Sequence, residues 1–287
     1  MKAGRITAQL FLACSFVFVI AQASAAQERF EKVFFSRTTW EKADWTRIDT
    51  SAIWSMDGWA KDAEVLAEIP EGPYLIGAFR AERIIGLPMI ALQLTAKQPQ
   101  QYVNQVGIEA NGESPLCSDL IKRLLVAFGS AVVDADASRG SRVFRAAEWV
   151  LGPTRIQLKC APDEAQKATH LTLIAAHRDA LRPLKSLLVI HCALTKIDEP
   201  SKQMEKVITI DENLDVAFEE NSVLAAGDDV TVTATAISLT QRIGFLYSYE
   251  ISRTTGNATV SASIGTTNAG TLFAGNCAKA SERRPEF

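Results

Sequence analysis

Alternating apolar and polar residues dominate the chain, and this pattern predicts β-strands over most of its length. Between residues 30 and 104, the runs EKVFFS, PYLIGAF and PMIALQLTA are short, apolar and bounded by Pro, Gly or polar residues, as strands are. The alternation is clearer in SRVFRAAEWV, TRIQLKC and HLTLIAA, between residues 141 and 176. These three segments predict an antiparallel meander, with a Leu-Gly-Pro turn between the first two.

One segment has helical spacing instead. In SPLCSDLIKRLLVAFG, Ser114 suits the N-cap, Pro115 suits the first helical position, and Gly129 supplies a stop. Apolar residues recur every three or four positions, at Leu116, Leu120, Ile121, Leu124, Leu125 and Phe128. Together with the strands, this helix predicts an α+β sandwich, in which one main helix covers an antiparallel sheet.

A polar segment, TKIDEPSKQMEK at residues 195–206, contains Pro200 and predicts a domain boundary. Beyond it every apolar run has the pattern of a strand, which predicts a small all-β sandwich or a barrel-like domain. Arg253-Thr-Thr-Gly256 separates two alternating strands and predicts a hairpin turn. We expect four parts: a signal peptide at 1–25, an α+β domain at 26–195, a linker at 196–206 and a β domain at 207–287.

The C-terminal tail combines ISRTTG, a further strand, the tripeptide GNC and the charged end SERRPEF. This pattern resembles the C-terminal hairpin of small secreted bacterial proteins of unknown function. The resemblance covers about 40 of the 287 residues. It implies a location in the cell envelope and no particular activity.

The first 25 residues have the order of a secretory signal peptide. Lys2 and Arg5 precede an apolar stretch, and Ala23 and Ala25 fit an A-x-A cleavage site. The apolar stretch is about half the length that spans a bilayer, and no later run is apolar enough to span one. We therefore expect cleavage after Ala25, no membrane span after cleavage, and a periplasmic or secreted mature protein.

Charge narrows the choice of partner. The signal segment contains two of the 30 basic residues and none of the 33 acidic ones, so the mature chain has 28 basic residues against 33 acidic ones. Its net charge of −5 and the lack of a basic block argue against nucleic acid as a partner.

Four cysteines remain after the predicted cleavage: Cys117, Cys160, Cys192 and Cys277. An even number in an exported protein predicts two disulfides, and the sequence allows three pairings. Alternation turns Cys160 toward the inside of the sheet. We expect Cys192 to pair with Cys160 on a neighbouring strand. In the alternative, Cys192 pairs with Cys117 on the helix, and Cys277 ties the tail to the first domain.

All three histidines lie between residues 169 and 192. If HLTLIAAH is one strand, His170 and His177 face opposite sides of it, and His191 points away from its neighbour Cys192. The chain has none of the usual local zinc-binding spacings. The loops DADASRG (134–140) and DENLD (211–215) lack the glycine that a calcium loop has at its sixth position. We therefore predict structural histidines, no metal site and no cofactor.

Four of the five tryptophans crowd into residues 40–59: Trp40, Trp45, Trp54 and Trp59. Flat aromatic faces bind sugar rings and peptides, and the interspersed Asp44 and Asp57 could accept hydrogen bonds from such a ligand. Alternatively, the four side chains pack against a sheet edge or a domain interface. This cluster is the best candidate binding surface that the sequence offers.

Sequence motifs of catalysis are lacking: there is no nucleophile elbow, Walker loop or dinucleotide fingerprint. We therefore predict a non-enzymatic binding or interaction role in the cell envelope, with an envelope protein, a peptide or a glycan as partner. The enzymatic alternative is a hydrolase of envelope polymers that uses His170, His177 or His191 with a nearby acid or Cys. A third possibility is an assembly protein that pairs through an edge strand of the C-terminal sheet.

Overall fold

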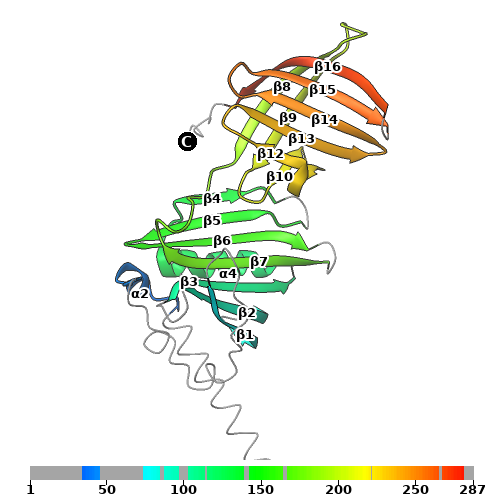
Figure 1. The fold of residues 1–287 in the computed structure, drawn as a ribbon. Helices are drawn as coiled ribbons and strands as arrows, with labels where there is room; N and C mark the ends of the chain where they lie inside the picture. The colour runs from blue at the N-terminus through cyan, green and yellow to red at the C-terminus, as the bar shows by residue number, and fades with distance from the viewer. Residues whose placement is uncertain are drawn as a thin grey trace, which may run out of the picture. The chain divides into compact units, whose positions relative to one another are not determined.

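The computed structural model describes residues 34–45, 74–84, 87–96, 103–113, 115–138, 142–163, 167–220, 222–264 and 267–280. These residues form mostly antiparallel β-strands in two sheets, with few helices (Figure 1). The predicted α+β fold therefore overstates the share of helices in the structure. The chain divides into two compact units: unit 1 is Met1–Val132, Glu148–Leu158 and Asp163–Arg182, and unit 2 is Val133–Ala147, Lys159–Pro162 and Pro183–Phe287.

The first sheet has seven strands in the order β1-β2-β3-β7-β6-β5-β4. The strands are β1 (Tyr74–Ile84), β2 (Leu87–Ala96), β3 (Val103–Gly112), β4 (Val133–Asp136), β5 (Arg145–Leu151), β6 (Thr154–Asp163) and β7 (Ala168–His177). The predicted meander is confirmed as β5, β6 and β7. Its first turn needs Gly152, which has a φ of +55°, because an added Cβ would lie 2.6 Å from the carbonyl oxygen of Glu41.

The predicted helix is confirmed as α4 (Pro115–Phe128). Its buried residues share one face: Cys117, Leu120, Ile121, Leu124 and Phe128. Gly129 ends the helix with a φ of +82°, and its N–H donates to the Leu125 carbonyl. Arg37, on the short helix α2 (Arg37–Glu41), donates from Nη1 to the Phe128 carbonyl at 2.9 Å. This bond satisfies one of the carbonyls that a helix leaves unpaired at its C-terminus.

The second sheet has nine strands in the order β11-β10-β9-β8-β16-β15-β14-β13-β12. The strands are β8 (Leu188–Lys196), β9 (Gln203–Asp211), β10 (Val216–Glu219), β11 (Ser222–Ala226), β12 (Val230–Val232), β13 (Ala236–Ile243), β14 (Phe245–Ser252), β15 (Asn257–Ile264) and β16 (Thr267–Lys279), with a 3-10 turn η1 (Gly227–Asp229) before β12. The turn predicted at 253–256 is confirmed between β14 and β15.

The predicted linker at 196–206 is wrong. These residues belong to the hairpin of β8 and β9, whose strands pair from Leu188↔Ile210 to Thr195↔Gln203. Unit 2 already includes the chain from Pro183 onward. The polar residues and Pro200 that suggested a linker form an exposed connection between two paired strands, because such a connection has the same composition as a linker.

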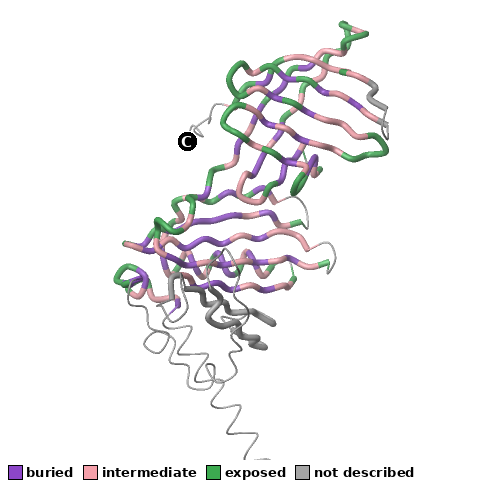
Figure 2. Tube along the Cα trace, in the orientation of Figure 1, coloured by how far each residue is buried: buried purple, intermediate pink, exposed green. Residues whose placement is uncertain are grey.

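The nine-stranded sheet curls until it is nearly closed into a barrel. Three strands separate β9 from β14 in the sheet order, yet Lys206 on β9 lies 3.3 Å from the Tyr249 hydroxyl on β14. Strand β11, at one edge, likewise contacts β13 near the other. Buried residues from all nine strands form one apolar core inside the curled sheet, from Leu188 to Cys277. Figure 2 shows buried positions alternating with less buried ones along these strands.

A disulfide joins Cys192 to Cys277 inside this core. The two residues lie directly opposite each other on β8 and β16, with their Cα atoms 4.0 Å apart. The predicted pairing of Cys192 with Cys160, and its alternative with Cys117, are therefore wrong, because β16 rather than the first sheet lies beside β8. Cys117 and Cys160 are disulfide-bonded as well. None of the described helices is long and apolar enough to span a membrane.

Candidate functional site

Two of the four clustered tryptophans are structural. Trp40 and Trp45 are buried with their rings stacked 6.2 Å apart. The Trp40 indole donates to the Phe34 carbonyl, the Trp45 indole donates to the Thr154 hydroxyl, and that hydroxyl donates to the Trp40 carbonyl. These bonds fix the segment around α2 to β6. Trp40 and Trp45 therefore offer no open aromatic face, while Trp54 and Trp59 lie outside the described residues and stay a prediction.

The three histidines have separate surroundings. His170 on β7 bonds through Nδ1 to Asn111 on β3, at 2.8 Å, and through Nε2 to the Thr172 hydroxyl, at 3.2 Å. His177, at the end of β7, accepts a hydrogen bond from the backbone N–H of Asp179. His191 is exposed on β8. In the part of the chain that the structure describes, no two histidines share a partner, and no three His, Cys, Asp or Glu side chains gather as metal ligands would.

A buried polar network on the first sheet fixes the chain that follows β7. Glu148 is 2% exposed, and it accepts a hydrogen bond from Gln157 at 2.7 Å and lies 3.3 Å from Arg155 Nε. The Arg155 guanidinium donates to the carbonyls of Arg178 and Leu181, and Gln157 donates to the carbonyl of residue 182. Every one of these bonds ends on the chain's own backbone or on another member of the network, so the network is a structural clamp.

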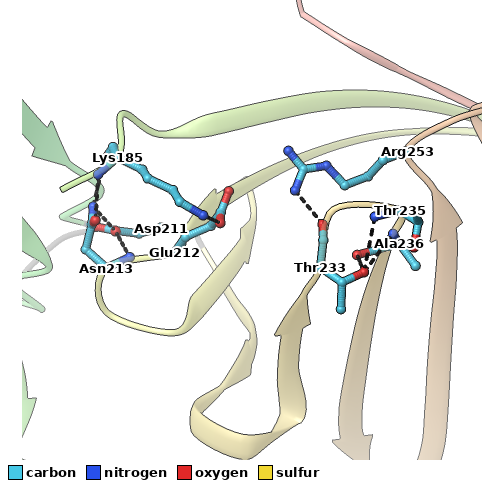
Figure 3. A network of polar contacts seen from close by, with 8 residues as sticks. All are labelled: Lys185, Asp211, Glu212, Asn213, Thr233, Thr235, Ala236 and Arg253. Atoms are coloured by element: carbon cyan, nitrogen blue, oxygen red, sulfur yellow. Dashed lines mark hydrogen bonds and ion pairs between the residues drawn. The ribbon is translucent and has the colours of Figure 1, made fainter. Parts of the chain in front are cut away.

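A second polar network shapes the connection between β9 and β10 (Figure 3). Asp211 is fully buried and accepts two hydrogen bonds from Asn213, one from its backbone and one from its side chain. Asn213 in turn bonds both backbone groups of Lys185, and Lys185 pairs with Glu212. Burial raises the pKa of the Asp211 carboxyl, although the bonds from Asn213 oppose that rise. The sequence DENLD thus forms a side-chain-capped turn.

The inner face of the second sheet carries apolar side chains that are exposed or only half-buried. We call five of them the apolar end: Met204, Ile243, Phe245, Tyr247 and Phe273. Met204, Tyr247 and Phe273 are half-buried and pack against the core. Ile243 is 63% exposed and Phe245 is 45% exposed, and the Phe245 ring lies 6.3 Å from that of Tyr247.

Strand parity places these side chains on the inner face. Side chains two residues apart point to the same side of a strand. On β13, Ile243 lies an even number of residues from the core residue Leu239. On β14, Phe245 and Tyr247 lie an even number of residues from the core residue Ile251. Phe273 has the parity of core residue Cys277 on β16 in the same way. The apolar end therefore continues the core toward solvent.

Among the described residues, the strands at the edges of the second sheet are shorter than the strands between them. The strands β10, β11 and β12, at the two edges of the sheet, have three to five residues, whereas the six strands between them have eight to 13. Because neighbouring strands are antiparallel, the β8–β9, β13–β14 and β15–β16 connections all lie at one end of the sheet. Burial falls toward the β13–β14 connection at this end (Figure 2).

A charged pair lies between the apolar end and the core. Lys206 points inward from β9, since it has the parity of the core residue Ile208, and its Nζ contacts both carboxylate oxygens of Glu219 at 2.5 and 2.6 Å. The Lys206 side chain is 11% exposed and that of Glu219 is 28% exposed. Lys206 also donates to the Tyr249 hydroxyl at 3.3 Å. We call Lys206, Glu219 and Tyr249 the polar base.

The pKa values of Lys206 and Tyr249 are both raised within the polar base. Burial by itself would lower the pKa of Lys206, but the hydrogen bond that Lys206 donates to Glu219 and nearby charges outweigh it, so the pKa is raised. Burial raises the pKa of the Tyr249 phenol, and Lys206 opposes that rise. At neutral pH Lys206 is therefore an ammonium and Tyr249 a neutral phenol.

No protein-family model, curated protein or solved structure matches the chain. Sequence reasoning missed the apolar end, although a signal was present: in QRIGFLY, residues 241–247, apolar residues continue through a hairpin connection that normally is polar.

Proposed function

We propose that this chain is an exported cell-envelope protein with a non-enzymatic binding role, and that the apolar end is its binding surface. The observation that supports binding is the exposure of Ile243 and Phe245 beside half-buried aromatic side chains on the inner face of a barrel-like sheet. The open end of such a sheet is a common place for ligands. Export is supported by the buried disulfides, because these persist in oxidising compartments.

Binding is tested with N-phenyl-1-naphthylamine, an uncharged apolar dye that fluoresces when it leaves water. We expect the intact protein to bind the dye, and the double variant Ile243→Ser/Phe245→Ser to bind it at least about tenfold more weakly, because burial of an apolar side chain contributes roughly 1.5–3 kcal/mol. Val207→Ser is the matched control, since Val207 is 42% exposed on β9 and has the opposite parity to Met204 and Lys206. Equal dye binding by all three proteins would contradict the proposed surface.

Export is tested by the mass of the protein recovered from the envelope fraction of its own host. We expect a chain that lacks residues 1–25 and in which alkylation without reduction labels no cysteine, because cleavage after Ala25 leaves four cysteines and all four are disulfide-bonded. Recovery of a full-length chain with reactive thiols from the cytoplasm would contradict export.

A further inference from the structure

The polar base is an unusual feature of an apolar interior. Moving a lysine and a glutamate away from water costs free energy that their mutual attraction does not reliably return. Apolar residues of similar size at positions 206 and 219 would have extended the core of unit 2 without that cost. An inward-pointing ion pair beside an exposed apolar surface is therefore better explained by recognition than by stability.

The hydrogen-bonding capacity of the base defines the group that it would recognise. In the described part of the chain, the Tyr249 hydroxyl accepts one bond, from Lys206, and its own proton is not used. Among the described residues, the Glu219 oxygens contact Lys206 alone, and they keep further lone pairs for a second donor. The base thus offers one donor and one acceptor, and its two charges already neutralise each other.

We propose that the apolar end and the polar base together bind a single-chain amphiphile with an uncharged head group that both donates and accepts hydrogen bonds, such as a hydroxyl or a primary amide. The alkyl chain lies against Phe245, Tyr247 and Phe273. The head group accepts from Tyr249 and donates to Glu219. A charged head group is disfavoured, because an anion must displace Glu219 and a cation must displace Lys206. This inference rests on the proposed binding function and adds the class of ligand.

The test uses one chain length with four head groups. The displacers n-decanol, n-decanamide, n-decanoate and n-decyltrimethylammonium are titrated at neutral pH against the naphthylamine dye bound to the full protein. We expect the alcohol and the amide to displace the dye at concentrations on the order of tenfold lower than the two ions, which corresponds to the affinity of about one good hydrogen bond.

Tyr249→Phe removes the donor and keeps the ring, so it separates recognition of the head group from general apolarity. We expect this variant to bind the dye normally and to lose most of the preference for the uncharged head groups, whereas Val207→Ser keeps that preference. Dye binding with the same ranking of displacers in the intact protein and in Tyr249→Phe would overturn the inference and leave the proposed function standing. Failure of the intact protein to bind the dye would overturn both.

Discussion

Replacing Cys192 and Cys277 with alanine is expected to lower the free energy of unfolding of unit 2 by about 4.5 kcal/mol. The bond closes a loop with a sequence separation of 85 residues, and loop-closure entropy assigns roughly that stabilisation to a cross-link of this length. The two sulfur atoms are also buried in the apolar core, so their removal loses packing as well.

Urea unfolding of the full chain can assign this loss to unit 2. All five tryptophans lie in residues assigned to unit 1, so tryptophan fluorescence follows that unit, while far-UV circular dichroism follows both. We expect the dichroism transition of the Cys192→Ala/Cys277→Ala protein to move to lower urea by more than the fluorescence transition. A loss below about 1 kcal/mol would show that the bond contributes little beyond the strand pairing around it.

Glu148→Ala is expected to have an effect of similar size on unit 1, a loss of about 3–5 kcal/mol in the free energy of unfolding. The substitution removes the carboxylate that faces Arg155, whose side chain is only 14% exposed, and so leaves a buried cation without its counter-charge. Gln157 loses its acceptor at the same time. Tryptophan fluorescence is the suitable probe, because Trp149 is the next residue in β5.

The double variant Glu148→Leu/Arg155→Met serves as the control for that experiment. Because both charges are removed together, we expect the double variant to lose less free energy of unfolding than Glu148→Ala alone. Buried ion pairs generally behave in this way. If Glu148→Ala lowers the free energy of unfolding by less than about 1 kcal/mol, then the clamp on residues 178–182 does not depend on this carboxylate.

Local patterns predicted the elements whose signals lie within a few neighbouring residues. The helix α4 follows from Pro115, the apolar spacing and Gly129, and the β14–β15 turn follows from the four residues 253–256. The helix and the turn depend on backbone preferences and on one buried face, and both of these can be read from neighbouring residues in the sequence. The linker prediction was wrong because polarity and proline mark exposed chain, and exposed chain occurs at hairpin connections as well as between domains.

The remaining features depend on partners far away in the sequence. Trp45 is buried because its indole meets Thr154, which is 109 residues away. Cys277 pairs with Cys192 because β16 lies beside β8, a neighbour relation that alternation of apolar residues leaves open. The polar base combines Lys206, Glu219 and Tyr249 from three strands, and it exists only because the sheet curls. No local pattern brings these three residues together.

The position of β16 also sets the order in which unit 2 can be completed. This last strand of the chain lies between β8, the first strand of its sheet, and β15. Until residues 267–279 have been synthesised, β8 has only β9 beside it, and the two halves of the sheet, β8–β11 and β12–β15, share no strand pairing. The nine-stranded sheet therefore cannot grow one strand at a time from β8, and the pairing that joins its two halves forms only once β16 is present.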